Sequence, residues 1–227
     1  MTAYTAEILT GLTEQHLVQR DDGVKLHQHV AAPFAALCQA AQQDGLDIKV
    51  ASSFRSFQRQ AQIWQAKFCG QKPVLGQNGE TVSLSQLQGK AKLDAILLYS
   101  ALPGASRHHW GTDLDLYDAA SVRPNYQLQL APEEYGPEGP FYRLTLWLIK
   151  HAEQFGFFMP YRRYQGGIAA EPWHLSYKPV AAHYLAQFSP QLLQSCLTQH
   201  PIAGQDLVLQ HLDTLFKQYV SNICEDK

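Results

Sequence analysis

Histidines and carboxylates at two places in the chain could together bind a catalytic metal ion. His108 and Asp115 lie seven residues apart across Gly111, and Glu171 and His174 follow later in the sequence. Two imidazoles and one carboxylate suit catalytic zinc, which keeps a fourth position for water. The remaining carboxylate could then act as general base on that water. The spacing alone is weak evidence, because a single histidine is more often a surface or hydrogen-bonded residue than a ligand.

Three segments carry a resemblance that strengthens the metal interpretation. SRHHWGTDLD, residues 106–115, resembles the S-x-H-x-x-G-x-x-x-D signature of the LAS-type zinc peptidases. This family includes D-alanyl-D-alanine carboxypeptidases and dipeptidases of the vancomycin-resistance type. EPWH, residues 171–174, resembles their E-x-W-H signature, and FRSF, residues 54–57, resembles their upstream Y/F-R-S segment. All three occur in the order of the family, and their conjunction is specific where any one alone would be weak.

The resemblance implies a role for each matching residue. His108, Asp115 and His174 would be the zinc ligands. Glu171 would be the catalytic base and, later, the acid that protonates the leaving amine. Arg55 would lie over the substrate carbonyl and stabilise the developing oxyanion, a contribution that is often the largest single catalytic term.

Other residues of the same segments would bind the substrate. Ser106 would hydrogen-bond the peptide near its terminal carboxylate, and Gln60 resembles a substrate-binding glutamine of the carboxypeptidase branch. Trp173 would form part of the core or the pocket wall and contribute shape only. Each role has a structural alternative, since Arg55 could pair with a surface carboxylate, Gln60 could be a solvated helix residue and Ser106 could be a turn or cap residue.

Two neighbours of the expected ligands are competing candidates. Gly111 fixes the register of the signature in favour of His108 over His109. Asp113 departs from the carboxypeptidase pattern, which usually has a small residue there. On a strand Asp113 would face the same side as Asp115. We expect it to orient a ligand histidine from behind, with direct metal ligation as the alternative.

Two further features flank or mimic the expected site. His27 and His29 alternate as metal ligands do, but no third ligand lies nearby, so we expect them at the surface. The stretch from Trp64 to Pro103 is long, and so is the Pro- and Glu-rich excursion after Asp118. We expect both to wall or cover the cleft and so to alter the range of substrates.

Apolar periodicity predicts the elements that must position these residues. Helices are expected over 6–19, 31–43, 56–68, 84–99, 142–155 and from 178 onwards, with breaks at Pro190 and 201–204. Strands are expected over 46–54, 111–118, 156–161 and 171–177. Separated strands flanked by helices, without βαβ alternation, predict an α+β fold. The resemblance implies a hedgehog/DD-peptidase-like form of it, in which a small antiparallel sheet packed with helices carries the zinc site.

Composition limits the class of protein. A chain of 227 residues with 11% aromatic residues can bury a core, and 18 basic against 20 acidic residues give no electrostatic case for nucleic acid. No apolar run approaches the roughly 18–20 residues of a membrane span. The sequence reads as a single peptidase domain over 1–227, with catalytic segments about 46–178 and helical additions at about 1–45 and 178–227. Four dispersed cysteines and the lack of a visible signal peptide favour the cytoplasm.

The resemblance implies a zinc-dependent carboxypeptidase that hydrolyses the D-Ala-D-Ala terminus of peptidoglycan stem peptides. A D-Ala-D-Ala dipeptidase and a peptidoglycan endopeptidase are the enzymatic alternatives. A non-catalytic zinc-bearing binding module, as in hedgehog-type domains, is the alternative from another class. The presence of Glu171 and Arg55 favours an enzyme, because a pure binder does not need a base and an oxyanion-stabilising cation. The expected partner is the peptide substrate, and the oligomeric state stays open.

Overall fold

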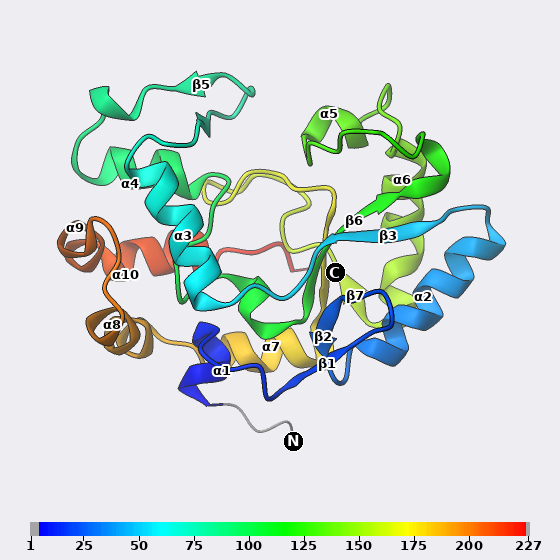
Figure 1. The fold of residues 1–227 in the computed structure, drawn as a ribbon, viewed down its shortest axis with the longest axis horizontal. Helices are drawn as coiled ribbons and strands as arrows, with labels where there is room; N and C mark the ends of the chain where they lie inside the picture. Colours follow the sequence, from blue (N-terminus) through cyan, green and yellow to red (C-terminus); the bar gives the residue numbers. More distant parts are fainter. Residues whose placement is uncertain (1–4, 226–227) are drawn as a thin grey trace.

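A four-stranded antiparallel sheet lies at the centre of the computed structural model, which describes residues 5–225 (Figure 1). Its strand order is β3-β6-β8-β7, with bounds Ile48–Ser52, Asp113–Asp118, His174–Tyr177 and Phe157–Phe158. Strand β6 pairs with a neighbour on each edge, and most of its side chains are buried. The predicted α+β fold with a small antiparallel sheet is therefore confirmed.

One face of this sheet is apolar and is covered by helices. Successive side chains of a strand point to opposite faces, so Leu114 and Leu116 of β6 share a face. Both are fully buried in a core with residues of α2 (Ala31–Gln43) and α6 (Tyr142–His151). This core fixes the strand register, because a slip by one residue would turn the leucines away from the helices.

The opposite face carries polar side chains. Pairing of β6 with β8 places Asp115 opposite His174 and Asp113 opposite Ser176. The register of β3 shifts between Val50 and Ser52, at the end of the strand from which the chain continues to the FRSF segment. The polar face therefore brings the 106–115 and 171–174 signatures together, and the FRSF segment follows the adjacent strand β3.

A second core lies on the other side of the molecule and is mainly helical (Figure 1). Its helices are α1 (Ala6–Thr10), α3 (Phe57–Phe68), α4 (Gly89–Leu97), α7 (Lys178–Gln187), α8 (Pro190–Gln199), α9 (Gln205–Gln210) and α10 (Leu212–Leu215). Fully buried Trp64, Leu93 and Tyr184 belong to it. Ser56 caps α3, since its side chain accepts a hydrogen bond from the Arg59 N–H.

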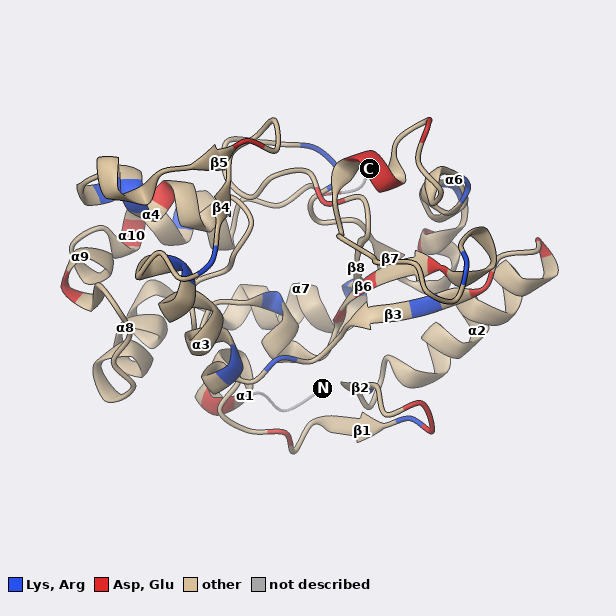
Figure 2. Ribbon diagram, turned by 45° about the horizontal axis from the view of Figure 1, so that its top comes forward, with Lys and Arg blue, Asp and Glu red and all other residues tan. Residues whose placement is uncertain are grey.

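Short elements complete the chain. They are the hairpins β1–β2 (Leu17–Gln19, Lys25–His27) and β4–β5 (Val74–Leu75, Thr81–Val82), α5 (Pro132–Tyr135), the 3₁₀ turns η1 (Leu84–Gln86), η2 (Arg107–Trp110), η3 (Ala119–Ser121) and η4 (Ala152–Phe155), and the π-helical turn η5 (Phe216–Val220). Basic and acidic residues are interspersed over these elements (Figure 2). Within residues 5–225, no helix has the length and apolarity needed to cross a bilayer.

The first predicted helix is wrong in its extent. Helix α1 ends at Thr10, and residues 17–19 of the predicted span form strand β1. Gly11 ends the helix with φ 76°, in the left-handed region that glycine adopts without strain. A Cβ at this position would also lie 2.3 Å from His109 Nδ1. The close approach of this turn to His109 therefore overrides the helical periodicity.

Candidate metal and catalytic site

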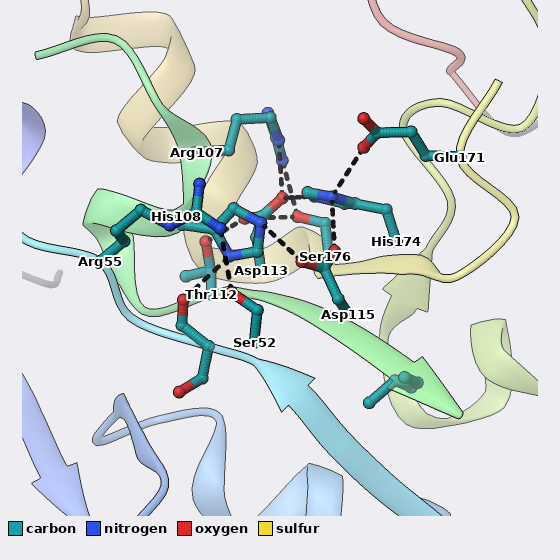
Figure 3. Close-up of polar contacts among 12 residues, drawn as sticks. Ser52, Arg55, Arg107, His108, Thr112, Asp113, Asp115, Glu171, His174 and Ser176 are labelled. Carbon is teal, nitrogen blue, oxygen red and sulfur yellow. Dashed lines mark hydrogen bonds and ion pairs between the residues drawn. The ribbon is translucent and has the colours of Figure 1, made fainter. Parts of the chain in front are cut away.

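His108, Asp115 and His174 converge from three elements, with their side chains buried (Figure 3). His108 lies on η2, Asp115 within β6, and His174 begins β8. One potential ligand atom from each lies within 4.8 Å of the others. Gly111 turns the chain from η2 into β6 with φ 65°, and a Cβ there would lie 2.8 Å from the His27 backbone nitrogen. The predicted ligand set is therefore brought together.

Each imidazole is held by one ring nitrogen and presents the other to Asp115. His108 Nδ1 lies 2.9 Å from the Ser53 carbonyl oxygen, and its Nε2 lies 3.4 Å from Asp115 Oδ2. His174 Nε2 lies 2.9 Å from Asp113 Oδ1, and its Nδ1 lies 3.2 Å from Asp115 Oδ1. A second hydrogen bond of this kind fixes the tautomer and orientation of a metal-binding histidine.

The donor set fits a cation. Asp115 Oδ1 and His174 Nδ1 are buried without a hydrogen-bond partner, a costly state for polar atoms. Burial lowers the pKa of His108 to about 4, which leaves the neutral imidazole that binds metals. Burial also opposes protonation of His174, yet the adjacent carboxylates of Asp113, Asp115 and Glu171 raise its pKa well above the ordinary value. The excess of carboxylates thus attracts positive charge, and two imidazoles with one carboxylate suit zinc.

Asp113 lies behind His174, where we expected an orienting residue. Its side chain is fully buried, and Oδ1 also accepts a 2.8 Å hydrogen bond from Arg107 Nε. Oδ2 accepts hydrogen bonds from Thr112 Oγ1 at 2.6 Å and Ser176 Oγ at 3.0 Å. Burial opposes ionisation, but Arg107 and these hydrogen bonds hold the pKa of Asp113 well below its usual range. The ionised Asp113 carboxylate is therefore held next to His174 Nε2, the ring nitrogen that faces away from Asp115.

Glu171 lies in a turn before β8, and not on the strand that the sequence predicted. Its N–H donates to the Tyr161 carbonyl, and its Oε2 lies 3.2 Å from His174 Nδ1 (Figure 3). Pro172 follows at once, and a proline disfavours regular strand pairing at this point. Burial raises the pKa of the Glu171 carboxyl above its usual range. A carboxylate with raised basicity therefore faces the candidate metal ligands.

Arg55 is fixed on several sides. Its Nη1 donates to Gln60 Oε1 at 2.8 Å and its Nη2 donates to Ser52 Oγ at 3.0 Å. Its backbone N–H donates to the His108 carbonyl, and His109 Nδ1 lies 2.6 Å from the Arg55 carbonyl oxygen. Arg55 lines the same cleft as the candidate metal ligands, and within residues 5–225 its guanidinium bonds to Gln60 and Ser52 instead of a surface carboxylate.

Gln60 and His109 hold Arg55 in position through contacts with its side chain and its carbonyl oxygen. Gln60 is fully buried on α3, and its Nε2 donates to the Ala101 carbonyl at 2.6 Å. Both ends of its carboxamide are thus bonded within the protein, and Gln60 is not a solvated helix residue. His109 is also fully buried, and its Nε2 accepts a 3.1 Å hydrogen bond from the Gly104 N–H. No pattern in the sequence indicates this supporting role of His109.

The cleft has a volume of about 750 Å³ and contains further predicted residues in its wall. Ser106 is buried with no partner for its Oγ, and Trp173 packs on Tyr135 with ring centroids 5.4 Å apart. Arg107 and Tyr161 also line the cleft, although the sequence analysis did not select them. Arg107 could have been noticed, because it stands between two signature residues.

The two long segments form walls of this cleft, as expected. Leu75 and residues 77–79 of the β4–β5 hairpin line it, and residues 129–133 line it from the excursion after β6. In Figure 1 the hairpin lies at the upper left, above α3 and α4, and α5 lies at the upper right, above β6. The cleft is therefore deeper than the sheet and η2 alone would make it.

His27 does not lie at the surface, as we had expected. It is fully buried, and its Nε2 lies 3.0 Å from the Tyr184 hydroxyl. Its Nδ1 accepts a hydrogen bond from the His29 N–H, while the His29 side chain is exposed. Hairpin β1–β2 packs against Gly111, which encloses His27 and explains the difference.

Comparisons with known proteins show the family to which the chain belongs. Residues 23–180 match the family model described as VanY, D-alanyl-D-alanine carboxypeptidase. An uncharacterized protein of Haemophilus influenzae is 36% identical over 121 residues, which cover 52% of this chain and 92% of that protein. A second one is 39% identical over 102 residues, which cover 43% and 70%. The chain belongs to the VanY family of D-alanyl-D-alanine carboxypeptidases, which is a family of peptidases.

Two solved structures share the fold. VanYB in complex with D-alanine-D-alanine gives a TM-score of 0.52 at 22% identity and covers 81% of this chain and 88% of its own. A mutant of the vancomycin resistance D,D-pentapeptidase VanY from a VanB-type cassette, in complex with Zn(II), gives 0.51 at 24% identity and covers 76% and 86%. The fold that carries the site is thus the fold of known VanY peptidases.

Proposed function

We propose that this protein is a zinc-dependent carboxypeptidase that hydrolyses the D-Ala-D-Ala terminus of peptidoglycan stem peptides. The observation that carries the proposal is the convergence of His108, Asp115 and His174 in one cleft with Glu171 and Arg55. The complexes of the two VanY structures, one with D-alanine-D-alanine and one with Zn(II), support both the substrate and the metal.

Glu171 and Arg55, beside the metal ligands, have different roles in hydrolysis of the peptide bond. Zinc held by the three ligands would polarise the scissile carbonyl and lower the pKa of water. Glu171 takes the proton of the attacking water and later gives it to the leaving amine, and its raised pKa suits a group that must hold a proton between these steps. Arg55 places a fixed positive charge where the carbonyl oxygen becomes negative.

The supporting residues keep Arg55 and the substrate in place. An arginine carries five N–H donors, so the bonds to Gln60 and Ser52 leave donors for the substrate. Gln60 therefore acts in our proposal as a positioning residue, in place of the direct substrate contact that the resemblance implied. Ser106 offers its unpartnered Oγ to the peptide, and Trp173 limits the width of the cleft.

Cleavage of three substrates tests this function: a stem pentapeptide, free D-Ala-D-Ala and a cross-linked muropeptide. The zinc-loaded protein should cleave a stem pentapeptide, lose this activity with a chelator, and regain it with added zinc. Preference for free D-Ala-D-Ala would instead indicate a dipeptidase, and cleavage within a cross-linked muropeptide would indicate an endopeptidase. A protein that binds zinc and a stem peptide but cleaves none of the three would be a binding module.

Asp113→Asn should weaken zinc binding about 10- to 100-fold, the usual cost of losing the outer hydrogen-bond partner of a ligand histidine. Asparagine keeps the shape of the side chain but lacks the charge that fixes the His174 Nε2–H. Competition with a chelating dye measures the affinity. Thr112→Val is the matched control, because it removes one hydrogen bond to Asp113 and leaves the contact with His174. Equal zinc affinity in the folded Asp113→Asn variant and the unaltered protein would contradict the orienting role.

A further inference from the structure

Arg107 is a buried cation in the cleft wall that the proposed chemistry does not use. It lies on η2 between Ser106 and His108, and its side chain is 2% exposed. The guanidinium lies over the Trp110 ring, with its carbon 4.9 Å from the ring centroid. A buried charge is costly unless it is paired and hydrogen-bonded, so each of its nitrogens needs a partner.

Two of the three guanidinium nitrogens have partners within the protein. Nε donates to Asp113 Oδ1 at 2.8 Å, and Nη2 donates to Ser176 Oγ at 2.6 Å (Figure 3). These two bonds fix the plane of the guanidinium. Nη1 is buried and has no hydrogen-bond partner among residues 5–225. The fixed arginine thus retains one free donor group.

Buried polar atoms without partners cluster around this cleft. Among the residues that the structure describes, five buried side-chain atoms lack a hydrogen-bond partner, and four of them belong to cleft-lining residues. Asp115 Oδ1 and His174 Nδ1 are accounted for by the candidate metal. Ser106 Oγ and Arg107 Nη1, on adjacent residues, are not. One is a hydroxyl and the other a cationic donor, and together they suit an anionic oxygen.

The buried charges of the site favour a single anionic group. Asp113, Asp115 and Glu171 are acidic, and Arg55 and Arg107 are basic. A divalent zinc ion therefore leaves the ionised buried groups with one positive charge in excess. A peptide with a free carboxyl terminus brings one negative charge, whereas an internal peptide segment brings none from its backbone.

We propose that Arg107 Nη1 binds the free α-carboxylate of the peptide substrate, beside Ser106 Oγ, which the family resemblance already places near that carboxylate. This inference rests on the proposed function and adds to it a residue that determines specificity. It makes the enzyme an exopeptidase that requires a free carboxyl terminus. Asp113 then contacts both His174 and Arg107, so one carboxylate sets the spacing between the metal ligand and the carboxylate-binding group.

Binding of two matched peptides tests the proposal without turnover. The zinc-loaded Glu171→Gln protein is titrated calorimetrically with a stem pentapeptide that ends in an acid and with the same peptide as an amide. We expect the acid to bind about 10- to 100-fold more tightly, as for hydrogen bonds to a charged group. Arg107→Lys in this background should lose most of that preference. A single ammonium can remain beside Asp113, but it lacks the arginine fork that also reaches the substrate.

The controls separate substrate binding from a purely structural role. Ser176→Ala removes the partner of Nη2 but retains the guanidinium, and should keep the preference for the acid. Zinc content and thermal unfolding are measured for every variant. If Arg107→Lys does not fold, Ser106→Ala tests the same pair without disturbing the ion pair, and should reduce the preference.

Three results would overturn the inference. The preference for the acid could persist in folded Arg107→Lys, or, if that variant does not fold, in Ser106→Ala. Arg107→Lys could instead weaken acid and amide binding equally with loss of zinc, which would assign Arg107 to positioning His174 alone. If the protein with Arg107 intact binds neither peptide, the proposed function itself fails, and the inference fails with it.

Discussion

Glu171→Gln should reduce release of D-alanine from a stem pentapeptide by about 10²- to 10⁴-fold, the usual contribution of a general base. Glutamine has nearly the same shape as glutamate but does not accept a proton at neutral pH. Because Glu171 is not among the three predicted ligands, zinc content should stay at one ion per chain. Steady-state kinetics of D-alanine release, combined with elemental analysis, measures both quantities.

Glu153→Gln is the matched control for this substitution. Glu153 is exposed on η4, and the same chemical change there should leave activity unaltered. Unchanged turnover in zinc-loaded Glu171→Gln would exclude Glu171 as the base. Loss of zinc together with activity would show instead that Glu171 holds the metal, in contrast to the ligand set that we propose.

Arg55→Met should lower kcat by about 10²- to 10³-fold, the effect of removing one donor that stabilises an oxyanion. Methionine fills part of the same volume but brings no charge to the substrate carbonyl. The loss should fall on kcat more than on KM, because the negative charge develops only in the transition state. Kinetics with the stem pentapeptide, over a range that includes KM, separates the two parameters.

Arg59→Met is the control for Arg55→Met, because Arg59 is an exposed residue of the following helix α3. A rise in KM at constant kcat in Arg55→Met would assign Arg55 to ground-state binding of the substrate. Arg55→Lys should recover part of the lost kcat, since it restores the charge without the hydrogen bonds to Gln60 and Ser52.

The candidate metal ligands could be predicted because they lie in short segments that resemble the family signatures, and because local patterns indicate the elements around them. Gly111 indicates the turn into β6, and the alternation of polar and apolar residues from Asp113 to Asp118 predicts a strand with one polar and one apolar face. Pairing of β6 with β8 then places Asp115 opposite His174, as two adjacent strands with polar residues on one face would do. The resemblance to the family signatures therefore supplied the expected ligand set, and the local turn and strand patterns indicated only the elements that carry it.

The supporting roles of Gln60 and Arg107 depend on contacts between distant segments, and the sequence did not reveal these roles. Gln60, on α3, accepts a hydrogen bond from Arg55 through its Oε1. Its Nε2 donates to the Ala101 carbonyl oxygen, which fixes the other end of the carboxamide. Arg107 meets Ser176 only after η2 and β8 come together. Hydrogen bonds of this kind leave no periodic pattern in the sequence, so composition and residue spacing do not predict them.

The errors in the predicted elements have the same origin. Apolar residues in 6–19 satisfy a helical period, but Gly11 lies against His109 and ends α1. We expected His27 at the surface because no third metal ligand lies near it in the sequence, yet the β1–β2 hairpin packs it against Gly111 and Tyr184. In both places a tertiary contact of the η2 segment outweighs the local preference.

The central claim is that His108, Asp115 and His174 bind one catalytic zinc ion. Anomalous diffraction at the zinc absorption edge, from crystals of the zinc-loaded protein, locates the ion directly. The account predicts a single peak about 2.0–2.2 Å from His108 Nε2, an Asp115 oxygen and His174 Nδ1. A peak bound by Asp113, or one that lacks His108 or His174, would contradict it.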